Sequence, residues 1–512
     1  MVRRDRARGG IALSAICVVL FLTFLDNTIV SVALADIQSS LHAGVTSLQW
    51  IVDGYMLAFA GLMLAGGTLG DIFGRRRVLL AGVAVFCGGA VISACAQSSG
   101  MLITGRVVMG VGAAACEPGT LSLIRHIYPG SRARARALGI WTAVSGVSLA
   151  AGPVLGGLLV ETWGWRAVFW FNFAFGVAAF VAAAITLSES SDPAARRLDL
   201  PGLVAGVIAV LGVTFAIIEG ESHGYSAPWV VALFVSAAAA AFVFGRLEHR
   251  SSDPMLDLSV IRRAVVAVPL AVGFITSFGL FAVFFFVALY LQVIVGKSGS
   301  QIAIEFLAMS AAMVGAGVLA GRWAAGRGPA APMAIGCVVA ACGIFLIDAL
   351  IGPSVSTLAL AGALALVGFG LGLALVALTA SVLGTVSPGR SGMAASAVNT
   401  SRELGGVLAV AILGAVVNGH LVAQLQDRLG ALGVPGPFRK AVIDAVTAGQ
   451  FSLGSASSNP LALGNLGVFA KVVEAAEAAF GDGLHIALLI AGALLLLAAV
   501  LSVTSLRTRS GE

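Results

Sequence analysis

The chain has 512 residues, of which 59% are hydrophobic and only 11% are charged, whereas soluble proteins carry about 25% charged residues. So few charges do not cover a soluble surface of this size, and a single soluble core stops growing at about 250 to 300 residues. The net charge of +6 comes from short arginine clusters between apolar stretches, not from one basic stripe, which argues against nucleic acid as a partner.

Apolar stretches long enough to cross a membrane follow one another along the whole chain. A transmembrane helix needs about 20 mostly apolar residues. The sequence predicts spans near 11–34, 48–68, 78–97, 101–123, 136–159, 166–187, 200–220, 227–247, 264–290, 301–320, 331–350, 356–381, 393–419 and 484–504. The first stretch is longer than the apolar part of a signal peptide, so we expect it to stay uncleaved. The predicted fold class is therefore all-α integral membrane, with fourteen transmembrane helices.

Arginine placement gives the parity and the orientation of these spans, because cytoplasmic loops are rich in Arg and Lys. With the N-terminus inside, the inner segments hold Arg75, Arg76, Arg77, Arg125, Arg132, Arg134, Arg136, Arg196, Arg197, Arg246, Arg250, Arg262, Arg263, Arg322, Arg327, Arg390, Arg507 and Arg509. The outer loops hold almost none, apart from Arg166 and Lys297. An even number of spans with both termini cytoplasmic follows. The scarcity of lysine suggests a bacterial source, and hence the bacterial cytoplasmic membrane.

One connection, 420–483, is much longer than the others and follows an odd-numbered span, which makes it external. It mixes short apolar stretches with charged residues such as Arg428 and Lys471. Partial helical order against the membrane face and a passive linker are both compatible with this pattern.

The inner end of the second span carries Gly67, Asp71, Gly74, Arg75 and Arg76 in a fixed spacing. The glycines permit a tight turn and close contact between helices, and Asp71 can face a helix N-terminus or an inner arginine. The segment resembles the GxLxDxxGRR motif of the major facilitator superfamily. A weaker copy over 317–322 follows the tenth span, as expected for a transporter built from two related halves.

Further motifs resemble the same family. Arg106 and Gly110 in the fourth span resemble its RxxxG motif, whose arginine faces the proton pathway. In the fifth span, Gly146, Gly152, Pro153, Gly156 and Gly157 resemble its antiporter motif. There the proline removes an internal hydrogen bond and the glycines allow close backbone approach, which gives a kinkable, closely packed helix.

The fourteen-span drug:proton antiporter group is the part of the family that the chain resembles most. The matching segments are 25–34 in the first span and 399–406 in the thirteenth, together with the extra pair of spans between the halves. The resemblance implies a six-helix bundle over 1–190, two inserted helices with an inner loop over 191–262, and a second six-helix bundle over 263–512. It also implies alternating access and export.

Four ionisable residues lie inside predicted spans: Asp26, Arg106, Glu117 and Glu403. Charges at the bilayer centre cost at least about 2.5 kcal/mol, so they suggest function, and we predict that these four carry proton coupling. The helical rise puts Asp26 and Arg106 at a similar depth, where they can pair as a proton switch or as a static ion pair. Glu117 lies about 16 Å further inward than Arg106.

Substrate contacts are predicted at Glu117, Glu403, Asp53, Asn399 and Phe284. Buried acids suit reversible protonation or attraction of a cation, although Glu117 can equally be a hydrogen-bonded structural carboxyl. Asp53 lies near a predicted outer end, where an interfacial position is the alternative. Lipid contact is the alternative for the phenylalanines at 281 and 284–286.

These predictions converge on a proton-coupled exporter of lipophilic, cationic drugs or related amphiphiles, in contact with protons and membrane lipid. A lipid or a secreted metabolite as cargo is the alternative, and a membrane sensor or a membrane enzyme fits less well. No GxxxxGK[ST] loop is present, which argues against a nucleotide-driven pump. The six cysteines form no CxxC pair, so we expect no metal and no cofactor, and we predict that they are buried apolar residues.

Overall fold

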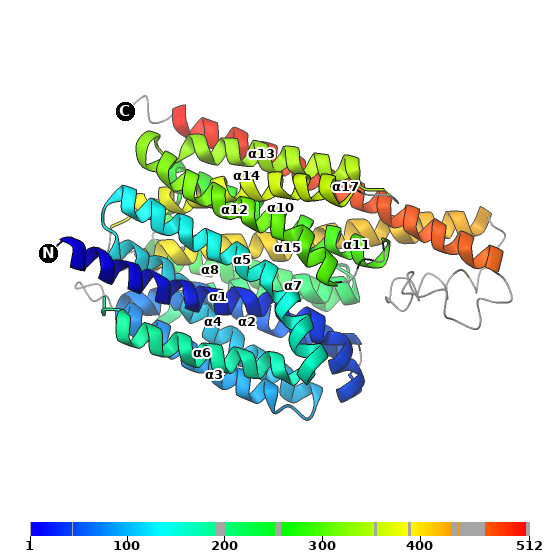
Figure 1. Cartoon of the computed structure of the whole chain (residues 1–512), viewed down its shortest axis with the longest axis horizontal. Helices are drawn as coiled ribbons and strands as arrows, with labels where there is room; N and C mark the ends of the chain where they lie inside the picture. Colours follow the sequence, from blue (N-terminus) through cyan, green and yellow to red (C-terminus); the bar gives the residue numbers. More distant parts are fainter. Residues whose placement is uncertain are drawn as a thin grey trace.

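The computed structural model describes residues 2–43, 45–190, 200–250, 258–295, 297, 299–352, 356–387, 391–431, 439 and 466–507. Within these ranges all regular structure is helical, as Figure 1 shows. In lipid, a chain has no water to satisfy its backbone N–H and C=O groups, so apolar stretches form helices that satisfy them internally. The predicted all-α membrane fold is confirmed.

The first half of the chain forms six helices: α1 (Val2–Leu41), α2 (Val45–Phe73), α3 (Arg75–Ala94), α4 (Ser99–Ile127), α5 (Ser131–Trp163) and α6 (Arg166–Thr186). Within this group α4 packs on α2 and α3, and α1 packs on α5 and α6. Two glycines with positive φ, Gly74 between α2 and α3 and Gly164 between α5 and α6, make the tight connections.

The second half holds α10 (Ala264–Phe281), η1 (Ala282–Val287), α11 (Ala288–Val293), α12 (Gly299–Arg327), α13 (Ala330–Leu350), α14 (Thr357–Thr385), α15 (Ser391–Ala431) and α17 (Leu466–Arg507). The predicted span near 264–290 therefore contains a π-helical turn, η1, which the sequence analysis did not predict. In this half α14 packs on α12 and α13, and α17 packs on α13 and α15.

Between the halves lie α7 (Leu200–His223), α8 (Pro228–Arg250) and the short α9 (Leu258–Ile261). Helix α7 packs on α8 and also on α2 and α15, one helix from each half. At Gly61 of α2, a Cβ atom would come within 2.1 Å of the side chain of Leu211, so α7 seats closely on α2. The predicted division at 190 and 262 stays a prediction.

The number of membrane-spanning helices agrees with the sequence. Among the described residues, twelve helices are long and apolar enough to cross a membrane, or up to fourteen if each of two bent helix pairs is one span. The bends lie in α2 and α5 and measure 50° and 40°. The start of α1 and the end of α17 lie at the same end of the bundle, as an even number of spans requires (Figure 1).

Three of the described helices are far longer than a bilayer requires: α1 has 40 residues, α15 has 41 and α17 has 42. The end of α15 and the start of α17 lie side by side and project beyond the other helices (Figure 1), where Leu421, Leu425 and Leu429 are buried. The described stretches 420–431 and 466–483 of this connection are thus helical: they belong to α15 and α17, which pack on one another. Residues 432–438 and 440–465 of this connection lie outside the described part.

The cysteines correct one prediction. Cys17, Cys87, Cys116 and Cys337 are buried as predicted, but Cys95 and Cys342 are exposed. An apolar side chain on the outside of a membrane helix can face lipid, so apolar surroundings in the sequence do not imply burial in the protein.

Candidate functional site

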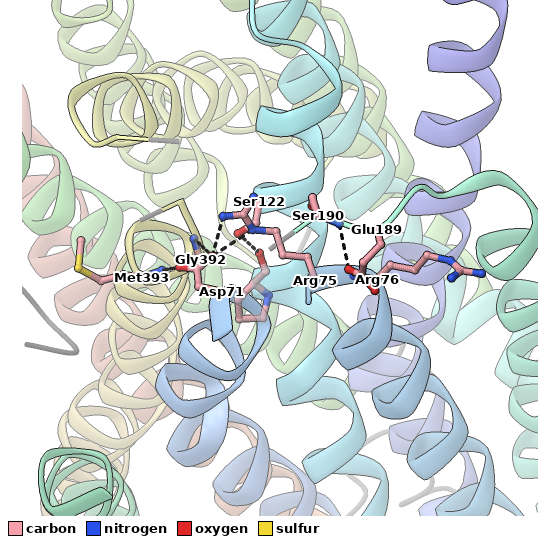
Figure 2. A network of polar contacts seen from close by, with 9 residues as sticks. Asp71, Arg75, Arg76, Ser122, Glu189, Ser190, Gly392 and Met393 are labelled. Atoms are coloured by element: carbon pink, nitrogen blue, oxygen red, sulfur yellow. Dashed lines mark hydrogen bonds and ion pairs between the residues drawn. The ribbon is translucent and has the colours of Figure 1, made fainter. Parts of the chain in front are cut away.

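Asp71 joins the two halves of the chain at the end of α2. Its carboxylate accepts hydrogen bonds from Arg75 at 2.8 and 3.0 Å and from the backbone N–H groups of Gly392 and Met393, both at 3.1 Å. Gly392 and Met393 belong to the first turn of α15, whose N–H groups have no partner within the helix (Figure 2). The two roles considered for Asp71, facing an arginine and facing a helix N-terminus, occur together.

Close packing supports this junction. A Cβ on Gly67 would lie 1.8 Å from the Ser396 hydroxyl, and a Cβ on Gly392 would lie 2.4 Å from the Gly67 carbonyl oxygen. Ser396 also donates a hydrogen bond to the Met63 carbonyl oxygen at 3.1 Å. Gly67 of the predicted motif and Gly392 of α15 are therefore needed for the close contact between α2 and α15.

Glu189, which follows α6, caps the N-terminus of α3. It accepts from the backbone N–H groups of Arg76 at 3.1 Å and Arg77 at 3.2 Å, while Arg75 N–H donates to the Ser190 carbonyl at 2.9 Å (Figure 2). Gly74 has φ of +104°, and a Cβ there would lie 2.7 Å from the Glu189 carboxylate. Arg75 and Arg76 thus differ: the side chain of Arg75 donates to Asp71, and that of Arg76 donates to the Ala184 carbonyl at 2.7 Å.

The glycines of α5 lie in three different environments. A Cβ on Gly152 would lie 1.9 Å from the Thr28 hydroxyl, and one on Gly156 would lie 2.8 Å from the Ile29 carbonyl oxygen. Both glycines therefore allow α1 to pack closely on α5. Gly146 faces Met313 of α12 at 3.1 Å, whereas Gly157 has nothing within 4 Å. The 40° bend falls between Leu149 and Val154, at Pro153, as expected where proline removes a helix hydrogen bond.

Asp26 and Arg106 form a fully bonded ion pair inside the first half. Arg106 Nη1 lies 2.5 Å from Asp26 Oδ2, and Asn172 Nδ2 donates to Asp26 Oδ1 at 2.6 Å. Arg106 Nε donates to the Ile51 carbonyl at 2.9 Å, and its guanidinium lies 4.4 Å from the centroid of the Tyr55 ring. The shared depth predicted for the pair is correct, and both carboxylate oxygens have partners.

Glu117 lies on α4 of the first half and Asn399 lies on α15 of the second, and these two helices pack on each other. Both side chains are buried, with 1% and 0% of their surface exposed. Neither oxygen of the Glu117 carboxyl and neither polar atom of the Asn399 amide has a hydrogen-bond partner in the described protein. Because buried polar groups in folded proteins are almost always bonded, four unpartnered atoms at one helix contact call for an explanation.

Arg402 and Glu403 complete this group from α15. Arg402 is buried, with its guanidinium 5.7 Å from the ring centroid of Trp141 on α5. Trp141 in turn donates to the Thr120 hydroxyl, at 3.0 Å, one turn after Glu117. Glu403 is half-buried, and both Glu403 and Arg402 lie near enough to Glu117 for their charges to act on it. We call Glu117, Asn399, Arg402 and Glu403, with Trp141, the interface cluster.

Two predicted contact residues lie apart from the interface cluster. Asp53 is half-buried on α2, next to Gly54, which packs on Val107. Along α4, Val107 is about 15 Å from Glu117. Phe284 lies in the π-helical turn and packs on Phe306, with ring centroids 4.8 Å apart.

Sequence reasoning did not assign roles to Arg402, Trp141, Asn172 and Glu189. An arginine and an amide inside apolar spans were available signals for Arg402 and Asn172, since polar groups are costly there. Trp141 and Glu189 offered none, because a tryptophan in a span and an acid in a polar segment are both ordinary.

Comparison with known proteins connects these features to a family. The model of the Major Facilitator Superfamily matches residues 16–410. The chain is 34% identical to the multidrug resistance protein Stp of Mycobacterium tuberculosis, over 93% of this chain and 88% of that protein. It is 33% identical to the methylenomycin A resistance protein of Bacillus subtilis, over 80% and 88%. The tetracenomycin C resistance and export protein of Streptomyces glaucescens is 30% identical, over 99% and 93%.

Two solved structures share the fold. The human organic anion transporter MFSD10 (TETRAN) aligns over 97% of this chain and 99% of its own, with a TM-score of 0.60. The proton:xylose symporter XylE aligns over 97% and 95%, with a TM-score of 0.61. Both are 14% identical to this chain, so the likeness concerns the fold.

Proposed function

The chain belongs to the major facilitator superfamily, and from this premise we propose that it is a proton-coupled efflux transporter of small lipophilic or amphiphilic compounds. Relatives that cover most of the chain are named for resistance to several drugs, to methylenomycin A and to tetracenomycin C. These names support efflux as the activity and small organic molecules as the cargo. No enzymatic role is part of the proposal.

The observation that carries the proposal is the interface cluster. Glu117, Asn399 and Arg402 are buried yet leave polar atoms without partners, at the contact between the halves that alternating access must separate. A ligand with complementary polar groups supplies the missing bonds. A site between moving halves binds cargo and changes its exposure in the same step.

The proposed coupling uses Glu117 and Glu403. A carboxylate without a hydrogen-bond partner in a buried place is costly, so its charge must be balanced by a bound cation or removed by a proton. A proton entering from outside displaces a cationic substrate from the acids, and loss of that proton to the cytoplasm restores the charged site. Asp26 and Arg106 are placed in the same pathway by the sequence, although their complete bonding favours the static role.

The bonds between the halves support an inner-closed state. Asp71 holds the first turn of α15, Arg125 at the end of α4 donates to the Val386 carbonyl before α15, and a Cβ on Gly139 of α5 would lie 2.5 Å from the Gly317 carbonyl of α12. Inward opening must break these contacts together. We propose that the ends joined here face the cytoplasm of a bacterium, with both termini on that side.

A secreted metabolite as the natural cargo is the second candidate. The observation that favours it is the relative named as a tetracenomycin C resistance and export protein, with which the chain aligns over 99% of its length. The same site and the same coupling serve either cargo, so the two candidates differ in substrate alone.

Reconstituted transport tests the proposal. Proteoliposomes under an imposed proton gradient are to be loaded with rhodamine 6G, a cationic dye, or with a fluorescent phospholipid. We expect dye movement against the proton flow in wild type, a loss of about tenfold or more in Glu117→Gln and Glu403→Gln, and a smaller loss in Asp26→Asn. Glu305→Gln is the matched control, because Glu305 is a buried acid that pairs with Lys297 outside the site.

Two outcomes would contradict the proposal. Full gradient-driven dye transport by both glutamine variants would remove the acids from the coupling. Movement of the phospholipid without the dye would instead make the protein a lipid exporter.

A further inference from the structure

The interface cluster carries charge of both signs, and a purely cationic substrate uses only one of them. Glu117 and Glu403 supply the negative side, and the positive side is Arg402, a residue of which 6% is exposed. Within the described protein, Arg402 forms no ion pair within 4.0 Å, and its Nε has no acceptor. The positive pole therefore needs an explanation of its own.

The fold holds Arg402 in position from two sides. Its Cγ lies within van der Waals reach of a Cβ placed on Gly273 of α10, at 3.5 Å. On the other side the guanidinium lies over Trp141, whose indole is fixed by its hydrogen bond to Thr120. A guanidinium that is held over an indole keeps its N–H groups free in the plane, where they can donate to an oxygen acceptor.

The buried guanidinium of Arg402 and the buried carboxyl of Glu117, which do not bond one another, are costly unless a ligand bonds both. The ligand that does so has a cationic nitrogen for the acids and a carboxylate or phenolate oxygen for Arg402. A flat aromatic skeleton holds two such groups at a fixed separation and can stack on an aromatic ring or a guanidinium plane. The amide of Asn399, with a free donor and a free acceptor, accommodates either end of such a molecule.

We propose that Arg402, which lies over Trp141, is the acceptor-binding pole of the transport site: its guanidinium donates hydrogen bonds to an acidic oxygen of the substrate. The site then selects amphoteric aromatic compounds, which carry a cationic nitrogen and an acidic oxygen on one skeleton. This deepens the proposed efflux function and rests on it. The alternative is that Arg402 is only an internal counter-ion for Glu117, in which case it favours no acidic group on the substrate.

Binding of two dyes that differ in one group separates these possibilities. Rhodamine B has a xanthene cation and a free carboxylate, and its ethyl ester has the same cation without the acid. Fluorescence anisotropy with the purified full-length protein in detergent gives both affinities without any proton gradient. We expect Arg402→Gln to weaken binding of rhodamine B by about 10- to 100-fold, the range of a hydrogen bond to a charged group, and binding of the ester by less than about threefold.

Controls distinguish a lost contact from a damaged fold. Arg402→Lys keeps the charge without the planar fork and should recover part of the rhodamine B affinity. Arg166→Gln is the matched control, because Arg166 lies over Trp165 at 4.2 Å, away from the cluster, and should alter neither affinity. Unchanged binding of the ester to Arg402→Gln itself demonstrates an intact site.

Each result is decisive for one proposal or the other. Equal weakening of both dyes, or wild-type protein that binds the ester but not rhodamine B, would overturn the role of Arg402. Carboxylate-selective binding without gradient-driven movement of either dye would overturn proton-coupled efflux and leave the acceptor-binding pole in place.

Discussion

Two buried clusters contain an acid, an arginine and an asparagine, yet they are built in opposite ways. Around Asp26, Arg106 and Asn172, both carboxylate oxygens are bonded, Asn172 Oδ1 is the atom left without a partner, and all three residues belong to the first half of the chain. In the interface cluster, Glu117, Asn399 and Arg402 come from both halves and leave polar atoms without partners.

The difference separates a cluster that holds a bundle together from one that we propose binds a ligand. The bonds of the Asp26 carboxylate and the Arg106 guanidinium compensate for the desolvation of these charges, so removal of one partner is costly. Where bonds are missing, removal of the polar group costs little, because the folded protein gained little from it. The same substitution should therefore reduce stability more in the Asp26 cluster and reduce transport more in the interface cluster.

The largest contrast is expected for arginine to methionine. Arg106→Met leaves Asp26 as an uncompensated buried charge and should lower the free energy of unfolding by about 3 to 5 kcal/mol. Arg402→Met should change it by less than about 1 kcal/mol, because no ion pair is lost. Titration with SDS in detergent micelles measures both. Asp26→Leu combined with Arg106→Met should recover most of the loss, and a large loss in Arg402→Met would mean that the interface cluster is structural.

A smaller contrast is expected for asparagine to leucine. Asn172→Leu removes a hydrogen bond to a charged group and should cost about 1.5 to 3 kcal/mol. Asn399→Leu removes an amide without partners, so its stability should equal or exceed that of the wild type, while dye binding weakens. The same titration and the anisotropy measurement test this pair. If both variants lose equal stability, Asn399 is bonded in the native state and the comparison fails.

Asp71 shows whether position between the halves or the lack of hydrogen bonds matters more, because it lies between the halves but both of its carboxylate oxygens are bonded. Asp71→Ala removes a helix cap and a partner of Arg75, and should lower the free energy of unfolding by about 0.5 to 2 kcal/mol. Labelling of a cysteine placed at Ser396 should also increase as the inner contact loosens. If stability is unchanged, the position between the halves, and not the missing bonds, explains the tolerance expected of the interface cluster.

The smallest effect is expected at Gly157, which gives a baseline for packing alone. Gly157→Ala meets nothing within 4 Å and should change stability by at most about 1 kcal/mol, in the favourable direction, from helix propensity. Gly152→Ala is its partner in the comparison, since its methyl group meets Thr28, and overpacking costs about 1 to 3 kcal/mol. Thermal unfolding of the two variants in detergent ranks them.

The sequence predicted the fold well because lipid imposes a simple rule: each crossing needs an apolar stretch of fixed length. It could not predict where α15 and α17 end. Their outer parts lie beyond the apolar spans and owe their order to packing on one another, as at Leu421 and Leu425, which hydropathy does not record. The π-helical turn of η1 was missed for a related reason, because its phenylalanines fit an ordinary span equally well.

The sequence predicted how deep the site residues lie in the membrane, but not which way their side chains point. A constant rise per residue placed Asp26 level with Arg106, and the ion pair confirms it. Which way a side chain points depends on the rotation of its helix, and in spans that are apolar on every face no periodic pattern shows that rotation. Nothing in the sequence therefore indicates that Arg402 faces Trp141 of the other half.

The length of α15 makes the helix a lever that starts at the proposed transport site. The helix carries Asn399 and Arg402 and then continues to Ala431, about 44 Å beyond Arg402 at 1.5 Å per residue. A rigid rotation of about 10° around the site, within the range of known domain motions, moves the far tip by about 8 Å. Outside the membrane, α15 and α17 would thus magnify the proposed rocking of their half. The distance between one label at the tip and one on the first half would then report each conformational change without a label in the proposed binding site.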